Sequence, residues 1–191
     1  MKKKQIFAIS LLTACAAIAA SGSLAYFNAS ETAHNVITSS SVDIRLEEWR
    51  ENPDPTGDDW IPFEDVTGVV PGAVVSKIVT VRNTGDATAW IRVKADLDVI
   101  FAPGITATPD LSLIDINYND EAWTLKDGYW YYDEPVKAGG VTEPLFTTVT
   151  FDINMGNAYQ NSKAEIDVLA QAVQSANNHS AATEAEGWPA E

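Results

Sequence analysis

The stretch from residue 69 to residue 99 constrains the fold of this chain more than any other part. After Pro71-Gly72, residues 74–81 are rich in valine and fairly apolar on both faces, as in a strand that is covered on both sides. Turn-forming residues follow at 83–86, and residues 90–99 then alternate between apolar and polar side chains. This pattern predicts two long strands joined by a short turn, as in a β-sandwich.

Further strand signals run through the rest of the chain. Residues 42–46 and 145–153 alternate in the same way. Within 123–132, Asp127-Gly128 separates two short strand-forming segments, and this dipeptide is a strong hairpin signal. Residues 164–176 fit a helix face and a strand about equally well by periodicity alone.

Other regions lack a clear alternation. Residues 49–65 contain several prolines and aspartates and are predicted to form a loop. The carboxylates at 54–59 offer oxygen ligands for calcium, but their spacing matches no calcium-binding loop, so a solvated acidic turn is the favoured interpretation. Residues 111–118 fit a strand or an irregular edge. Residues 177–191 are polar and rich in alanine, which predicts a disordered tail.

The amino terminus has the organisation of an export signal. Three lysines at 2–4 precede an apolar run at 6–20, and small residues at 21–25 suit a signal peptidase. We therefore expect residues 1–25 to be a signal peptide that is cut between Ala25 and Tyr26. An alternative is a lipoprotein signal with a lipid on Cys15, but the apolar stretch before that cysteine is short.

Charge and cysteine content narrow the classes of partner. The 191-residue chain has a formal charge of −15, and loss of the three signal lysines would bring it to about −18. Such a charge argues against nucleic acid or an anionic lipid surface as partner, and we expect membrane contact only through the uncleaved signal. The expected mature chain has no cysteine, so its stability must come from packing and assembly rather than from disulfides. Its length suits one domain with a real core.

Two stretches of the sequence resemble the TasA/camelysin family. The aromatic pair Tyr26-Phe27 directly follows the expected cleavage site, and an Asn-x-apolar-Thr segment at 35–38 and an alternating Val-Asp-Ile strand at 42–44 come next. A longer match runs from 71 to 93, with Pro-Gly, a valine-rich strand, Asn-x-Gly and Trp-Ile-Arg-Val in that order. The chain departs from the family in having isoleucine at 37, where phenylalanine is common, and serine at 40, where glycine is common.

This resemblance implies a fold, a location and partners. Family members are secreted by Gram-positive bacteria, are processed by the SipW-type signal peptidase and include fibre-forming biofilm matrix proteins. The expected fold is all-β, a single antiparallel, jelly-roll-like β-sandwich over 26–176, with a strand at 164–176. The expected location is the extracellular matrix or the cell surface. The expected partners are the SipW-type peptidase, other copies of the chain and an accessory matrix protein.

A physical argument points to assembly through the new amino terminus. Residues Tyr26, Phe27, Val36 and Ile37 give this free end apolar and strand-forming character. A free terminus frays unless it pairs, and the edge of a sheet offers unpaired backbone groups that can capture it. The segment 26–40 is therefore predicted to be an exchangeable strand that completes a neighbouring molecule and builds a filament.

Catalytic signals are weak. The two histidines, His34 and His179, are far apart, and no His-Glu-x-x-His motif is present. We therefore expect no enzyme activity, no catalytic or metal-binding residues and no cofactor. A camelysin-like cell-surface metalloendopeptidase is one alternative. A carbohydrate-binding surface module is another, with Trp130 and Tyr131 as contact residues. The sequence does not decide whether Lys77 or Lys94 makes an isopeptide crosslink.

Overall fold

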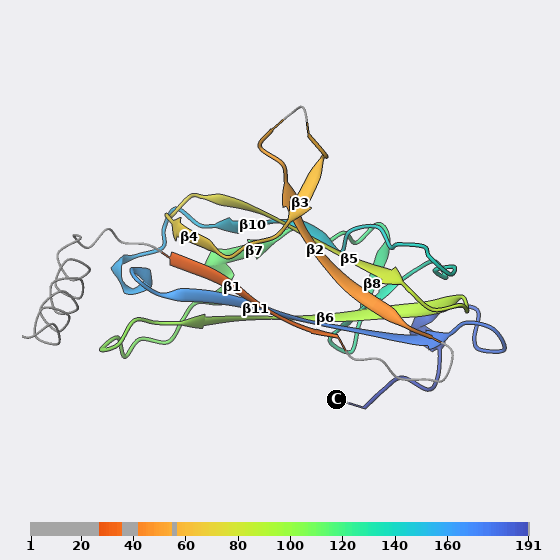
Figure 1. Cartoon of the computed structure of the whole chain (residues 1–191). Coiled ribbons are helices and arrows are strands. Elements are labelled where there is room, and N and C mark those ends of the chain that lie inside the picture. Colours follow the sequence, from red (N-terminus) through yellow and green to blue (C-terminus); the bar gives the residue numbers. More distant parts are fainter. Residues whose placement is uncertain (1–26, 36–41, 55–56, 191) are drawn as a thin grey trace, which may run out of the picture.

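The computed structural model describes residues 42–54 and 57–190 and the backbone of residues 27–35. Two mainly antiparallel sheets pack face to face (Figure 1), which confirms the predicted all-β sandwich. None of the residues described forms a helix long and apolar enough to cross a membrane. The strands are β1 (Phe27–Asn35), β2 (Ile44–Glu51), β3 (Trp60–Pro62), β4 (Val66–Val69), β5 (Val74–Asn83), β6 (Ala89–Ile100), β7 (Ile114–Ile116), β8 (Trp123–Lys126), β9 (Tyr129–Tyr132), β10 (Phe146–Phe151) and β11 (Lys163–Gln174), with short 3₁₀ helices at η1 (Leu111–Leu113), η2 (Asn157–Tyr159) and η3 (Ala182–Glu184).

The strand order brings the amino-terminal strand into the first sheet. That sheet has the order β4-β1-β11-β6-β9-β8, and the second has the order β3-β2-β5-β10-β7. Neighbouring strands are antiparallel except β1 and β11, which pair in parallel. The longest ladder joins β6 to β11 over the full length of both strands. β11 therefore holds β1 on one side and the long strand β6 on the other.

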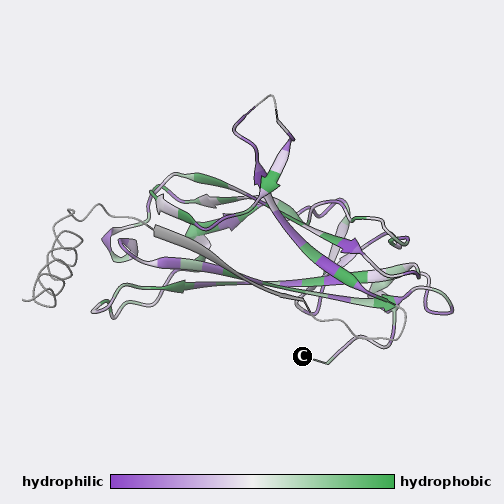
Figure 2. Cartoon of the chain, in the orientation of Figure 1, coloured by the Kyte–Doolittle hydropathy of each residue, from purple (hydrophilic) through white to green (hydrophobic). Residues whose placement is uncertain are grey.

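The core lies between the two sheets and follows the alternation in the sequence. In β5, Val79 and Val81 are completely buried, as are Ile91 and Val93 in β6. Figure 2 shows apolar and polar residues alternating along several strands. β-branched side chains suit this pleated, half-buried setting, so the valine-rich pattern accounts for the two central strands.

Turn chemistry joins the strands where the sequence predicts it. Asn83 is fully buried, and its side-chain amide donates hydrogen bonds of 2.8 Å to the carbonyls of Ala87 and Val136. Its amide oxygen accepts from the backbone of Gly85 at 3.0 Å. At the β8–β9 hairpin, Asp127 and Gly128 have positive φ angles of 52° and 81°. Two such residues form the tight turn that matches strand twist.

The structure settles the ambiguous segments and corrects two. Residues 164–176 are strand, not helix, for almost their whole length, and 111–118 contain η1 and the short strand β7. Residues 49–65 are not simply a loop, because β2 continues to Glu51 and pairs with β3 in an arm that projects from the sandwich (Figure 1). The tail is not disordered: the described part, residues 177–190, packs on the first sheet with Ala182 and Ala185 buried.

Candidate assembly site

The candidate site is the position that β1 occupies in the first sheet. β1 runs parallel to β11 over eight register pairs, from Asn28 beside Lys163 to Asn35 beside Ala170. On its other side it pairs with β4, where Phe27 lies opposite Val69 with a register shift before the next pair. The amino-terminal strand thus lies inside the sheet rather than at its edge.

The neighbouring strand β11 presents an apolar row to the core beside β1. Ala164, Ile166, Val168 and Ala170 are at most 6% exposed and belong to the main core cluster. The alternate side chains are less buried, and Asp167 is exposed. A strand beside β11 therefore covers one side of the core. It also forms hydrogen bonds with the backbone groups on the edge of β11 that faces away from β6.

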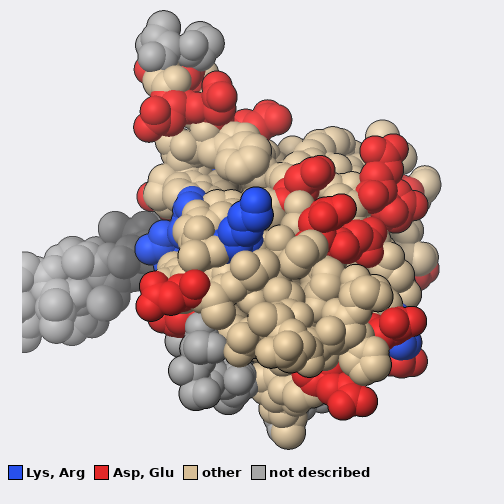
Figure 3. All heavy atoms as spheres, turned by 90° about the vertical axis from the view of Figure 1, so that its right-hand side faces the viewer, with Lys and Arg blue, Asp and Glu red and all other residues tan. Residues whose placement is uncertain are grey.

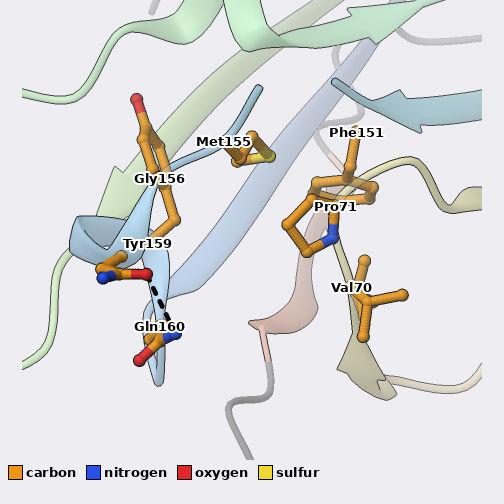
Figure 4. A pocket seen from close by; sticks show the side chains of 9 residues that line it. Val70, Pro71, Phe151, Met155, Gly156, Tyr159 and Gln160 are labelled. Atoms are coloured by element: carbon orange, nitrogen blue, oxygen red, sulfur yellow. Dashed lines mark hydrogen bonds between the residues drawn. The ribbon is translucent and has the colours of Figure 1, made fainter. Parts of the chain in front are cut away.

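An open pocket lies where the described part of β1 begins. It has a volume of about 120 Å³, and Val69, the register partner of Phe27, is among its lining residues. Figure 4 shows Pro71 and Phe151 close together, with Met155 and Tyr159 across from them. The pocket is lined by Val69, Val70, Pro71, Phe151, Met155, Gly156, Asn157, Tyr159 and Gln160.

A buried ion pair lies inside the sandwich. Lys77 of β5 and Glu48 of β2 have side chains that are 4% and 5% exposed, and Lys77 Nζ lies 2.8 Å from Glu48 Oε1. The Lys77 ammonium also lies 4.1 Å from the centre of the Phe63 ring. Sequence reasoning missed this pair, although Lys77 is in phase with the core valines 75, 79 and 81. Lys94, the other candidate for a crosslink, is 3.4 Å from Asp96.

A second ionic group lies on the outer face of the same sheet. Arg82 contacts both carboxylate oxygens of Glu47, at 2.7 and 3.0 Å, and Arg45 contacts Oε1 at 2.6 Å. Burial by itself would raise the pKa of Glu47, but the hydrogen bonds and charges of Arg82 and Arg45 outweigh it and hold that pKa below its ordinary value of 4.5. These contacts tie β2 to β5.

The predicted sugar-contact residues are not arranged as an open platform. Trp130 is half-buried, and its ring stacks on Tyr118 with centroids 4.6 Å apart. Tyr131 is 5% exposed and meets the edge of the Trp188 ring. Burial, with a smaller effect of the Asp96 charge, raises the pKa of Tyr118 to about 12. Tyr131 is therefore covered by the tail, and Trp130 exposes only part of its ring.

The carboxy-terminal segment covers the outer face of the first sheet around Arg92. The Arg92 guanidinium carbon lies 3.9 Å from the Tyr129 ring centre and 4.6 Å from that of Trp188. Arg92 donates a 2.8 Å hydrogen bond to Gln171, which is completely buried. Trp90 Nε1 also donates to the carbonyl of His179 at 3.1 Å. These contacts explain why a polar, alanine-rich tail is ordered.

Charge and metal ligands complete the description. Figure 3 shows several separate clusters of acidic side chains on one face and only a few basic ones. Within 42–54 and 57–190, no three His, Cys, Asp or Glu residues are grouped so that they could hold a metal ion. Ala25, Tyr26, Val36 and Ile37, as well as Cys15, lie outside the described residues, whereas Phe27 is the first residue of β1.

Comparison with known proteins gives no relative. The chain matches no family model, no curated protein and no solved structure.

Proposed function

We propose that this chain is an exported structural protein that polymerises into extracellular fibres by passing its amino-terminal strand to the next copy. The observation that carries the proposal is the position of β1, which lies between β11 and β4 although it stands near the start of the chain. The resemblance to the TasA/camelysin family supports the same function. Cleavage at Ala25 by a SipW-type peptidase would free the strand.

The physical basis is the gap that departure of β1 would leave. The backbone groups of β11 and β4 that pair with β1 would lose their partners. The apolar row of β11 from Ala164 to Ala170 would be exposed to water. Unpaired strand edges and uncovered apolar surface both favour capture of another strand. The β1 strand of a second copy has the same sequence and fits the same gap. Donation from each copy to the next does not close on itself, so it extends as a filament.

A pair of single-cysteine variants tests strand donation directly. Thr32 and Asp167 are register partners on β1 and β11. Neighbouring strands lie about 4.8 Å apart, within the range that a disulfide spans. The chain starting at Tyr26 has no cysteine of its own. We expect Thr32→Cys protein mixed with Asp167→Cys protein, under mild oxidation, to give a disulfide-linked heterodimer whose yield rises with concentration.

A matched control excludes chance collisions between surface thiols. Leu125→Cys places the thiol at an exposed position of β8, the strand at the far edge of the same sheet, and should give little heterodimer with Thr32→Cys. Electron microscopy of the chain starting at Tyr26 should show fibres at rising concentration, and deletion of Tyr26–Thr38 should abolish them. The proposal is refuted if the deleted chain still forms normal fibres, or if the Thr32/Asp167 mixture links no better than the control.

A further inference from the structure

The buried pair of Glu48 and Lys77 is unusual because both charges face the apolar interior. Lys77 is in phase with Val75 and Val79, which point into the core, and Glu48 is in phase with Leu46. Glu48 Oε2 is buried and has no hydrogen-bond partner among the described residues. Taking two charges out of water is costly, and a buried pair contributes little unless further polar groups complete it. The contribution of this ion pair to stability therefore does not explain its presence inside the sandwich.

Its place in the fold connects this pair to the amino-terminal strand. Lys77 lines a small apolar cavity together with Ala164 and Ile166 of β11, so Lys77 and that strand border the same part of the interior. The register places Glu31 of β1 directly beside Ile166. Residues paired across a ladder lie on the same face of a sheet, and Ile166 is on the core face. Positions 29 and 31, the register partners of Ala164 and Ile166, are thus the β1 positions beside this cavity, and position 31 carries the acidic residue.

We propose that Lys77, held in place by Glu48, binds the carboxylate at position 31 of an amino-terminal strand. The strand can come from the chain itself or from a neighbouring copy, because both have the same sequence. The inference deepens the proposed function by assigning a recognition device to the position through which assembly would occur. The Lys77 ammonium attracts the incoming carboxylate, and the aromatic face of Phe63 adds to the stabilisation of the cation.

The site would fix the register of the strand. Glu31 is the only acidic residue between Phe27 and Asn35. A slip by one residue moves every side chain to the other face, and a slip by two places Ala29 or Ala33 at the position beside Ile166. In either case Lys77 would meet no carboxylate from the strand. Apolar packing specifies the register of a short strand of small and polar residues only weakly. One buried ionic contact would therefore add the specificity of register that apolar packing does not provide.

A charge swap tests the inference. The parent is a chain that starts at Tyr26 and carries cysteines at both Thr32 and Asp167. The readout is the total yield of the disulfide between these two positions, whether it forms within one molecule or between two. Glu31→Lys places like charges together and should lower the yield about tenfold or more. Adding Lys77→Glu restores one positive and two negative groups and should return the yield to within about twofold of the parent. The control Ser30→Lys introduces a lysine at the neighbouring register position, beside Glu165, and Lys77→Glu should not rescue any effect of that change.

A milder cycle covers the case in which the swapped chain does not fold. Glu31→Gln and Lys77→Met should each lower the disulfide yield. The double variant should give a yield no lower than that of the single variant with the lower yield. Circular dichroism and urea unfolding identify the folded variants. Failure of rescue in a folded swap variant, or simple additivity of the two losses, overturns the inference. Disulfides that form only within single chains at every concentration contradict the fibre proposal alone, because the dependence of yield on residues 31 and 77 is measured separately.

Discussion

Replacement of Arg92 by alanine gives the sharpest test of how the carboxy-terminal segment is held. Arg92 lies on the outer face of β6, between the Tyr129 ring on β9 and the Trp188 ring of the tail. It also donates hydrogen bonds to Gln171 of β11 and to the hydroxyl of Tyr131, at 2.8 and 3.1 Å. One side chain therefore joins three strands of the first sheet to the tail.

The expected loss of stability follows from these contacts. Each cation–π contact contributes about 0.5–2 kcal/mol, depending on how far it is removed from water. Loss of the Arg92 donor leaves the Gln171 amide oxygen buried without that partner, which costs about 1–3 kcal/mol. The contacts share one side chain and do not add fully. We expect Arg92→Ala to lower the free energy of unfolding by about 2–4 kcal/mol.

Two measurements check this expectation. Urea unfolding followed by tryptophan fluorescence gives the change in the free energy of unfolding. Limited proteolysis should cleave within 177–190 in the variant under conditions in which the parent resists. Lys137→Ala is the control, because it removes the same charge at an exposed position and should change stability by less than about 0.5 kcal/mol. A loss below about 0.5 kcal/mol for Arg92→Ala, with the tail still protected, would refute the assigned role of Arg92.

Two further predictions concern acid stability and the hairpin turn. The pKa of Glu47 is depressed in the fold, so its ion pairs contribute fully to stability above its ordinary pKa of 4.5, and this contribution is lost as the pH falls below that value. Glu47→Gln should therefore reduce the decrease in the free energy of unfolding that urea unfolding measures as the pH falls through the acid range. An equal decrease in the variant and the parent would contradict this role of Glu47. Gly128 has a φ of 81° with no atom near an added Cβ, so Gly128→Ala should cost about 1–2 kcal/mol in thermal or urea unfolding through backbone strain alone. Gly156→Ala is the matched comparison, since Gly156 is equally open but has a φ of −81°, and an equal loss at both sites would show that the turn conformation is not the cause.

Local patterns in the sequence were sufficient where one face of a strand is buried and the other is not. The alternation along 74–81 and 90–99 predicted β5 and β6 because each apolar position there meets the opposite sheet. Asp127-Gly128 predicted the hairpin because both residues tolerate positive φ angles. Side chains of β9 alternate between the two faces of the sheet, but the local sequence does not reveal that Trp188, far along the chain, covers the outer face at Tyr131.

Long-range contacts account for what the sequence did not reveal. The β2–β3 arm contains the prolines and aspartates that suggest a loop, yet pairing of Trp49 with Pro62 extends the ladder into it. The tail has little apolar surface of its own. Its order depends on Arg92 and on a sheet face that comes from distant strands. Composition of one segment cannot predict such order, because the partner is outside the segment.

Three cations of this acidic chain make contacts within the fold, and this bears on how copies would associate. Lys and Arg number 12 against 27 Asp and Glu. Lys77 is buried with Glu48, Arg92 is enclosed by aromatic rings and Arg82 holds Glu47. The acidic surface would repel a second copy approaching side by side. The proposed strand donation at the β1 position would avoid this repulsion, because it would join two copies through backbone groups inside the sheet rather than through folded surfaces.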